Sequence, residues 1–480
     1  MSTTGDNVTV TRIAIVGGGP GGYEAALVAA QLGAEVTVIE RDGPGGSAVL
    51  TGTVPSKTLI ATAEVMSIAA ESAELGVRLG GKDAPGIEAL HPDSKQVAAD
   101  LARVNARVKR LAQAQSTDIG ARLAREGVRV LRGTGRLSGP HRVVATLADG
   151  GEETIEADAV LLATGAHPRA LPDALPDGQR ILSWNDLYEL KQLPDRLIVI
   201  GSGVTGAEFA SAYKALGSDV VLVSSRERVL PHEDADAAQV LEDVFARRGM
   251  TVLSSARAQA VKRVGDGVVV ALQDGRTVEG SHALMAVGSV ANTADLGLDK
   301  AGVRLNEAGF IEIDRVSRTT ARGVYAAGDC TGVLMLASVA AMQGRIAMWH
   351  ALGDAVSPLD LKTVSSNVFT DPEIATVGYT QVNLERGGIP NASVKLPLAT
   401  NARAKMQGVH DGFVKLFCRP SSGIVVGGVV VAPRASELIF PVALAVELSL
   451  TVDQVAHTFT VYPSLTGSLA EAARQLHPRG

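Results

Sequence analysis

Residues 8–40, VTVTRIAIVGGGPGGYEAALVAAQLGAEVTVIE, decide the fold of this chain. A β-rich run at 8–16 ends in apolar residues, and the glycine-rich stretch GGGPGG follows it directly. An alanine-rich helical run then reaches Gly33, and a second apolar strand at 35–39 is followed by Glu40. This order of strand, glycine turn, helix, strand and acid predicts a dinucleotide-binding βαβ unit.

Each glycine of this turn has a separate physical task. Gly17 allows the tight turn, Gly19 lets the backbone approach a pyrophosphate, and Gly22 lets the helix pack closely against the strand. The N-terminus of the helix offers unpaired N–H groups to the phosphates. Glu40 is expected to accept hydrogen bonds from ribose hydroxyls.

A second unit of the same kind begins about 180 residues later. A strand at 197–200 leads into GSGVTG, in which Gly201, Gly203 and Gly206 repeat the glycine spacing. The helical run AEFASAYKALG and a strand at 219–223 follow. Two complete units are far more specific than one glycine motif, and they predict two bound dinucleotides in one chain.

Composition limits the remaining possibilities. The chain has 480 residues, which is too long for one core and predicts about three domains. Its net charge of −6 gives no nucleic-acid footprint, and its two cysteines, Cys330 and Cys418, support neither a disulfide framework nor a metal site. No apolar run is long enough to span a membrane and the N-terminus is polar, so a cytoplasmic location is expected.

The stretch at 45–57, GGSAVLTGTVPSK, carries a resemblance to a known family. It resembles the redox-active segment of the flavoprotein disulfide reductases (the class I pyridine nucleotide-disulfide oxidoreductases), which reads GGxCxxxxCxPSK. Gly46 and Lys57 match that pattern, whereas Ala48 and Thr53 stand where the two cysteines would be. Thiolate chemistry is impossible for alanine and threonine.

A second departure lies near the C-terminus. Family members read HPxxxE there, and the His–Glu pair serves the partner subunit's thiols as acid and base. The matching stretch here is YPSLTG, so Tyr462 replaces the histidine and Gly467 the glutamate. The thiols and their base are lost together, which favours a changed function. Cys330 directly follows Asp329 and is expected to be a small buried residue rather than a redox group.

The resemblance covers nearly the whole chain and implies an α/β fold. It has two Rossmann-like dinucleotide-binding domains, for FAD and NAD(P), and a C-terminal α+β dimerisation domain. The implied domains are a first FAD-binding part, an NAD(P)-binding domain, a second FAD-binding part and a dimerisation domain, at 1–168, 169–288, 289–362 and 363–480. Apolar helical stretches at 437–448 and 452–459 belong to the last of these, which implies a homodimer.

The resemblance also implies the residues of the site. Lys57 would lie near the flavin N5 and form an ion pair with Glu208; the alternative is that these two residues form an incidental surface pair. Tyr462 would face the flavin of the partner subunit. The expected contacts with FAD or NAD(P) are Gly17, Gly19, Gly22, Glu40, Gly46, Lys57, Gly135, Thr164, Gly165, Gly201, Gly203, Gly206, Ser224, Arg226, Arg228, Gly288, Asp329, Leu336 and Ala337.

The choice of nicotinamide nucleotide depends on the residues after the strand at 219–223. Ser224 takes the place of the acid that repels a 2′-phosphate, and its hydroxyl is able to donate to phosphate. Arg226 and Arg228 would supply charge-assisted bonds. We expect both nucleotides to work, with NADPH favoured. Two solvated arginines beside Glu227 are the alternative.

Within the family, the chain looks most like the cysteine-lacking, lipoamide-dehydrogenase-like NAD(P)H quinone reductases. The expected function is therefore hydride transfer from NAD(P)H to FAD and direct electron transfer to a quinone. There are three alternatives: a protein that resembles dihydrolipoamide dehydrogenase without having that activity, a diaphorase with another acceptor, and a non-catalytic flavin-binding or redox-sensing partner.

Overall fold

The computed structural model describes residues 10–77 and 97–477. Residues 8 and 9 of the first predicted strand lie outside the described residues, and the strand itself begins at Arg12. The chain divides into two compact units, which are treated separately. The first contains residues 1–56, 107–168 and 289–360, and the second contains residues 57–106, 169–288 and 361–480.

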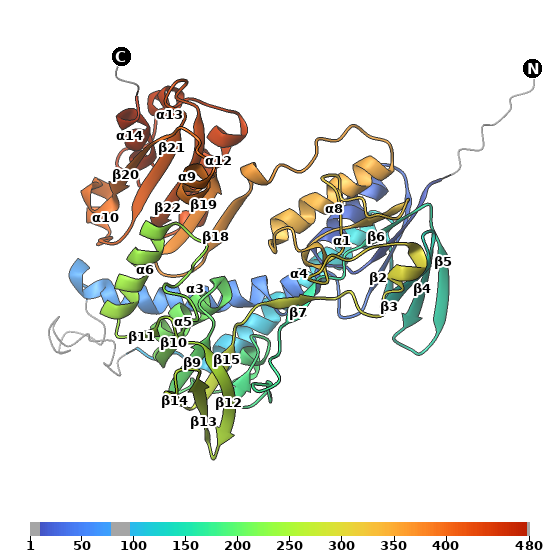
Figure 1. Ribbon diagram of the computed structural model, residues 1–480, viewed down its shortest axis with the longest axis horizontal. Helices are drawn as coiled ribbons and strands as arrows, with labels where there is room; N and C mark the ends of the chain where they lie inside the picture. The colour runs from blue at the N-terminus through green and yellow to red at the C-terminus, as the bar shows by residue number, and fades with distance from the viewer. Residues whose placement is uncertain (1–9, 78–96, 478–480) are drawn as a thin grey trace, which may run out of the picture. The chain divides into compact units, whose positions relative to one another are not determined.

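A seven-stranded sheet in the order β17-β6-β1-β2-β3-β4-β5 forms the centre of the first unit (Figure 1). Strands β17, β6, β1, β2 and β3 pair in parallel, whereas β3, β4 and β5 form an antiparallel meander. The strands are β1 (Arg12–Val16), β2 (Glu35–Glu40), β3 (Arg129–Gly139), β4 (Arg142–Leu147), β5 (Glu152–Glu156), β6 (Ala159–Leu162) and β17 (Val324–Ala326). A small antiparallel pair joins β7 (Ala166–Pro168) and β16 (Ser289–Ala291).

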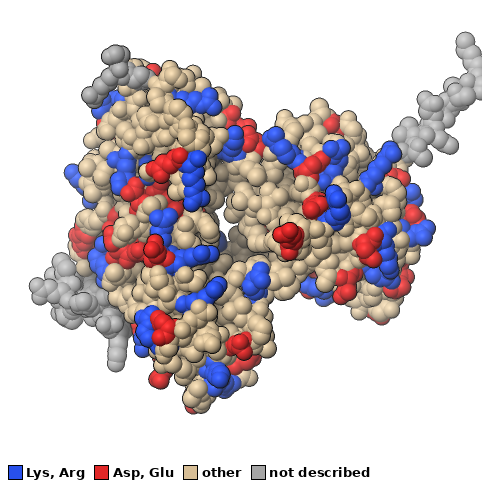
Figure 2. Space-filling view, in the orientation of Figure 1, with Lys and Arg blue, Asp and Glu red and all other residues tan. Residues whose placement is uncertain are grey.

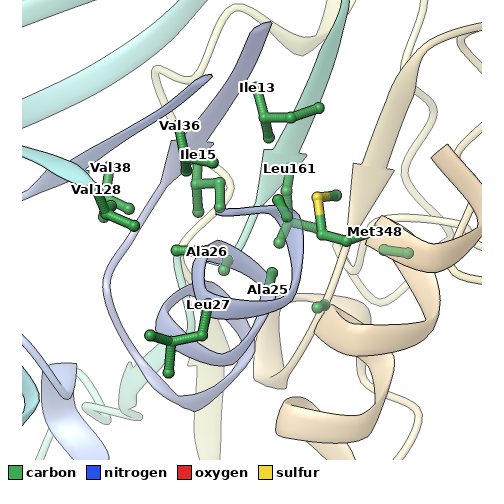
Figure 3. Packing of buried hydrophobic residues seen from close by; sticks show 14 of the residues in the cluster. Ile13, Ile15, Ala25, Ala26, Leu27, Val36, Val38, Val128, Leu161 and Met348 are labelled. Atoms are coloured by element: carbon green, nitrogen blue, oxygen red, sulfur yellow. The ribbon is translucent and has the colours of Figure 1, made fainter. Parts of the chain in front are cut away.

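Two helices pack closely on this sheet, α1 (Pro20–Gln31) and α8 (Ala337–Ala351). Small residues permit the close approach, because a Cβ on Gly344 would lie 2.0 Å from the carbonyl oxygen of Gly21. Figure 3 shows Leu27 of α1 and Met348 of α8 in one buried cluster with Ile15 of β1. Ile13 and Ile15 of β1 face this helical layer, whereas Ala14 and Val16 belong to a second buried cluster, so this strand is buried on both faces.

The second unit contains a parallel sheet in the order β11-β10-β9-β15-β8. Its strands are β8 (Ile181–Leu182), β9 (Arg196–Ile200), β10 (Asp219–Val223), β11 (Thr251–Leu253) and β15 (His282–Met285). The helices α5 (Val204–Leu216) and α6 (Ala235–Arg247) follow β9 and β10, and a three-stranded meander is formed by β12 (Ala258–Val264), β13 (Gly267–Leu272) and β14 (Thr277–Gly280).

The second unit also holds an antiparallel sheet in the order β18-β19-β22-β21-β20 (Figure 1). Its strands are β18 (Ser365–Val368), β19 (Glu373–Gly378), β20 (Ala392–Pro397), β21 (Phe413–Cys418) and β22 (Val425–Ala432). The short helices around it are α9 (Gln381–Arg386), α10 (Ala402–Met406), α11 (Ala435–Leu438), α12 (Phe440–Glu447), α13 (Val452–His457) and α14 (Gly467–Gln475).

The α/β fold class predicted from the sequence is confirmed, with two differences in the helices. The helical stretch predicted at 437–448 consists of α11 and α12, because Pro441 favours the start of a new helix. The stretch predicted at 452–459 ends at His457. Two longer helices, α3 (Thr53–Glu71) and α4 (Leu101–Arg125), complete the fold.

Acidic and basic side chains are interspersed on the face shown in Figure 2. No helix among residues 10–77 and 97–477 is long and apolar enough to cross a membrane.

Candidate functional site

The first glycine turn connects β1 to α1 and is too crowded for side chains. Gly17 has a φ of +100°, and a Cβ there would lie 2.3 Å from the carbonyl oxygen of Ala163. A Cβ on Gly22 would lie 1.9 Å from the carbonyl oxygen of Gly17, whereas the Cβ position of Gly19 faces open space among the described residues. Helix α1 starts after Gly19 without a side-chain cap, so its first N–H groups are available to a phosphate. The turn fits a dinucleotide pyrophosphate.

Glu40 ends β2 and holds the glycine turn in place. Its side chain is buried, and its Oε2 accepts the N–H of Gly18 at 2.6 Å. Its Oε1 accepts the N–H groups of Asp42 at 2.7 Å and Gly43 at 3.2 Å. A carboxylate has about four acceptor positions, so Glu40 keeps capacity for a ribose hydroxyl.

The stretch at 45–57 lies directly beside this turn. The N–H of Gly45 donates to the carbonyl oxygen of Gly18 at 2.8 Å. Gly46 has a φ of +56°, and a Cβ there would lie 2.9 Å from the Cα of Gly19. Gly46 therefore needs to be glycine for close backbone approach, next to the position where the pyrophosphate fits.

The two positions that lack cysteine lie in short helices. Ala48 is in α2 (Gly46–Leu50), and Thr53 is the exposed first residue of α3. Both cysteines of the chain, Cys330 and Cys418, are free and buried. Burial raises the pKa of the Cys330 thiol to about 11, and its Sγ donates to the carbonyl oxygen of Ala327 at 3.3 Å. The prediction that Cys330 is a small buried residue is confirmed.

The turn after β6 contains two predicted cofactor residues, Thr164 and Gly165, and both are hydrogen-bonded to Asn292. Thr164 donates through Oγ1 to the carbonyl oxygen of Asn292 at 2.7 Å, and Asn292 donates through Nδ2 to the carbonyl oxygen of Thr164 at 2.8 Å. The N–H of Asn292 also donates to the carbonyl oxygen of Gly165 at 3.0 Å. These reciprocal bonds hold the carboxyl end of β6, the edge at which ligands bind in such sheets.

The carboxylate of Asp329 lies just beyond the end of β17. It is partly buried, burial raises its pKa, and it makes no side-chain hydrogen bond with the described residues. A partly buried carboxylate of this kind fits a hydroxyl-bearing ligand, which would donate a hydrogen bond to it. Helix α8 begins at Ala337 after Leu336, again without a side-chain cap.

Two further glycines predicted to contact cofactor have other contacts in the structure. Gly135 lies in β3, where a Cβ would be 3.1 Å from the methyl groups of Val16. Close packing against β1 is enough to account for this glycine. In the second unit, Gly288 has a φ of +95° and accepts the N–H of Arg169 at 2.9 Å. Their contacts with cofactor stay predictions.

The second glycine turn, between β9 and α5, repeats the first in detail. Gly201 has a φ of +110°, and its N–H donates to the carbonyl oxygen of Val223 at 2.9 Å. A Cβ on Gly206 would lie 1.8 Å from the carbonyl oxygen of Gly201, whereas the Cβ position of Gly203 faces open space among the described residues. Helix α5 also starts without a side-chain cap. This turn fits a second pyrophosphate.

Ser224 follows β10 and is completely buried. Its Oγ lies 2.7 Å from the Oγ of Ser202 and donates to the carbonyl oxygen of Arg226 at 3.0 Å. The hydroxyl is thus engaged inside the protein, which differs from the expected donation to a phosphate. Arg226 is exposed and Arg228 is half-buried, with its Nη2 3.5 Å from the carbonyl oxygen of Pro231.

Lys57 of α3 and Glu208 of α5 form an ion pair, with 2.7 Å between Nζ and Oε2. The side chain of Glu208 is 4% exposed and that of Lys57 is 29% exposed. The contact is therefore partly buried, whereas the place of this pair beside the flavin stays a prediction. A buried carboxylate fixes the position of the ammonium group and leaves part of it open to a ligand.

Sequence reasoning missed Phe369, which follows β18. Its N–H donates to Oε1 of Glu208 at 3.0 Å, and its ring centroid lies 4.8 Å from Nζ of Lys57. No local pattern predicts this contact, because Phe369 and Glu208 are 161 residues apart in the chain.

Tyr462 lies between α13 and α14 and is 86% exposed. Phe459 and Val461 beside it are also exposed, at 102% and 78%. His457 ends α13, is exposed, and its Nδ1 lies 2.7 Å from the carbonyl oxygen of Asp453. It is a surface helix histidine.

Two family models match the chain. Residues 11–344 match the family described as pyridine nucleotide-disulphide oxidoreductase. Residues 364–473 match the dimerisation domain of the pyridine nucleotide-disulphide oxidoreductases.

Individual relatives match over nearly the full length. A Mycobacterium tuberculosis protein named NAD(P)H dehydrogenase (quinone) is 56% identical over 476 residues, which covers 97% of this chain and 94% of the relative. Dihydrolipoyl dehydrogenase of Zymomonas mobilis is 33% identical over 470 residues, covering 97% of each. The crystal structure of LpdA from Mycobacterium tuberculosis has a TM-score of 0.91 and 55% identity, and it covers 97% of this chain and 100% of that one.

Proposed function

The chain belongs to the pyridine nucleotide-disulphide oxidoreductase family and is an FAD-dependent oxidoreductase that uses NAD(P)H; on that premise, we propose that it passes electrons from NAD(P)H through the flavin directly to a quinone. No redox disulfide takes part in this reaction. FAD, when bound, accepts a hydride from the nicotinamide and gives the electrons to the acceptor.

One observation carries this proposal: the chain has no cysteine at the two positions of the family's redox disulfide, but it does have the ion pair between Lys57 and Glu208. Ala48 and Thr53 offer no thiol, and the two cysteines of the chain are buried. Lys57 and Glu208, by contrast, are in contact at 2.7 Å. The chain therefore keeps residues suited to hydride transfer and lacks residues for disulfide exchange. A relative at 56% identity bears the name of a quinone-reducing dehydrogenase, which agrees with the proposal.

In this proposal Lys57 supplies a fixed positive charge beside the flavin N5. Glu208 holds the ammonium group, and the burial of its carboxylate reduces the screening of the pair by water on that side. A preorganised cation favours the electron-rich form of the cofactor without reorganisation during the reaction. A flat, conjugated quinone suits direct transfer because it is able to stack on an aromatic cofactor.

We assign the two dinucleotides to the two glycine turns. The turn at Gly17 would hold FAD, with Glu40 toward the ribose and Asp329 toward the ribitol. The turn at Gly201 would hold NAD(P)H. We propose the corresponding domains with the bounds expected from the sequence, 1–168, 169–288, 289–362 and 363–480.

We also propose a homodimer formed through residues 364–473, which match the dimerisation domain. Phe440 begins α12 and Leu448 directly follows it; both are 63% exposed, and such apolar exposure favours a protein interface. Tyr462 would then face the partner's flavin in the place of the family histidine. The two free, buried cysteines agree with a reducing, cytoplasmic setting.

Rapid mixing tests the function directly. The purified flavoprotein is mixed with NADPH or NADH, and we expect the flavin absorbance to bleach and to return when menadione is added. Lipoamide and glutathione disulfide should be reduced at background rates, and iodoacetamide should leave menadione reduction intact. Turnover with lipoamide comparable to menadione contradicts the proposal. Bleaching without return to menadione indicates another acceptor, and no bleaching indicates a non-catalytic flavin partner.

A further inference from the structure

The ammonium group of Lys57 has two partners. Its Nζ lies 2.7 Å from Oε2 of Glu208 and 4.8 Å from the ring centroid of Phe369. Phe369 also donates its N–H to the other carboxylate oxygen of Glu208 at 3.0 Å. Each oxygen of the buried carboxylate is therefore occupied, and one residue contacts both members of the ion pair.

The turn that carries Phe369 is fixed on α5. The N–H of Asp371 donates to Oγ of Ser211 at 3.2 Å, one helical turn beyond Glu208. The guanidinium group of Arg248 lies 2.8 Å from Oδ2 of Asp371 and donates to its carbonyl oxygen at 3.2 Å. The same guanidinium group pairs with Glu71 of α3 at 2.8 Å. The turn between β18 and β19 is thus fixed at its backbone as well as its side chains.

We propose that Phe369 is a positioning residue for Lys57: its ring holds the ammonium group, and its N–H holds the carboxylate that pairs with it. The proposal rests on the role of Lys57 in flavin reduction. The negative face of an aromatic ring attracts a cation, and the attraction is stronger where water is partly excluded. Lys57 has four rotatable side-chain bonds, so a carboxylate contact alone leaves freedom that the ring removes.

A matched set of variants separates positioning from packing. Phe369→Leu removes the ring and keeps much of the apolar volume, whereas Phe369→Tyr keeps the ring. We expect Phe369→Leu to slow flavin reduction by about 2- to 30-fold, the range of a cation–π contact. Phe369→Tyr should restore the rate, and FAD should stay bound in both.

The double variant Lys57→Met with Phe369→Leu gives the decisive comparison. If the ring acts through Lys57, the double variant reduces its flavin at the rate of Lys57→Met alone. If the two losses multiply, Phe369 acts independently of Lys57, and the proposal is overturned. Tyr379→Leu is the control, because it removes another ring, 5.1 Å from Nζ of Lys362, outside the proposed site.

A second readout does not depend on turnover. The FAD-loaded protein is labelled with limiting acetic anhydride, and acetylation of Lys57 is measured by peptide mass spectrometry. We expect faster labelling of Lys57 in Phe369→Leu and wild-type labelling in Phe369→Tyr and Tyr379→Leu. Unchanged labelling in Phe369→Leu overturns the positioning role. Changed labelling together with a wild-type reduction rate in Lys57→Met would instead overturn the function proposed for Lys57.

Discussion

The hydroxyl oxygens of Ser202 and Ser224 lie 2.7 Å apart in the second glycine turn. At the corresponding position of the first glycine turn, the N–H of Gly18 donates to the carboxylate of Glu40. The two turns correspond closely. The N–H of Gly17 donates to the carbonyl oxygen of Ile39 at 2.8 Å, directly before Glu40, and the N–H of Gly201 donates to that of Val223 at 2.9 Å, directly before Ser224. The second turn thus has two neutral hydroxyls where the first has a carboxylate. This arrangement removes the negative charge that would repel a ribose 2′-phosphate.

We predict that both nicotinamide nucleotides work and that NADPH is favoured. Arg226 is exposed beside Ser224, so Arg226→Ala should weaken NADPH much more than NADH, measured as kcat/KM. Arg276→Ala, at an exposed arginine between β13 and β14 of the same unit, is the control. A wild-type preference for NADH of about tenfold or more, equivalent to about 1.4 kcal/mol, contradicts the prediction.

Ser224→Glu should reverse this preference. A carboxylate at this position corresponds to Glu40 in the first turn and would repel the negatively charged 2′-phosphate of NADPH. We expect this repulsion to disfavour NADPH by more than about tenfold. Ser224→Ala is the matched control, because it removes the hydroxyl without adding charge and should change discrimination little. The measurement is the ratio of the two kcat/KM values, and an unchanged ratio in Ser224→Glu would mean that the ribose binds elsewhere.

Lys57→Met should slow flavin reduction while FAD stays bound. The variant keeps most of the side-chain volume and removes the charge, so the loss resembles that of one preorganised donor, about 2.7–4 kcal/mol or roughly 100- to 1000-fold. Rapid mixing with NADPH measures the rate. Lys405→Met, an exposed lysine in α10, serves as the control. An unchanged rate in Lys57→Met would dismiss the role of the ammonium group.

The sequence predicted those parts of the site that depend on local chain geometry. The glycines of both turns were identifiable because Cβ atoms at Gly22 and Gly206 would meet backbone oxygens at 1.9 Å and 1.8 Å. Such clashes restrict residue type at fixed spacing, so they are visible in sequence. The strands and helices around the turns followed from the same pattern.

Contacts between residues that are far apart in the sequence could not be predicted in this way. Phe369 meets Glu208 across 161 residues, and nothing near Phe369 in sequence indicates that partner. The Ser202–Ser224 pair was missed because a serine hydroxyl has several possible partners, and only the folded geometry selects one. The pairing of Lys57 with Glu208 was predicted from the family resemblance, because no pattern in the sequence around either residue indicates it.

The exposed apolar residues of the C-terminal region predict a dimer in sedimentation. Leu448→Asp, just after α12, should weaken the dimer and reduce activity, because it places a charge on a surface that we expect to be buried against a second copy. Val264→Asp is the control, since Val264 is 60% exposed but lies in β12, outside residues 364–473. A wild-type monomer with full activity would refute both the dimer and the place given to Tyr462.

A buried lysine in β21 gives the last prediction. The side chain of Lys415 is 5% exposed, and its Nζ lies 2.9 Å from Oδ2 of Asp234 and 2.8 Å from Oδ2 of Asp236. Burial acts against the charged lysine, but the hydrogen bonds and charges of the two aspartates outweigh it and raise its pKa. Asp234, 1% exposed, also caps α6. Lys415→Met would leave that carboxylate buried without a cation.

We therefore expect Lys415→Met to cost about 3–5 kcal/mol of stability, seen as a lower Tm. Lys395→Met removes the exposed lysine that also pairs with Asp236, and it should cost less than about 1 kcal/mol. Adding Asp234→Asn to Lys415→Met should recover part of the loss, because asparagine still caps the helix but carries no charge. Equal Tm values for the two lysine variants would show that the buried pair contributes no more than the surface one.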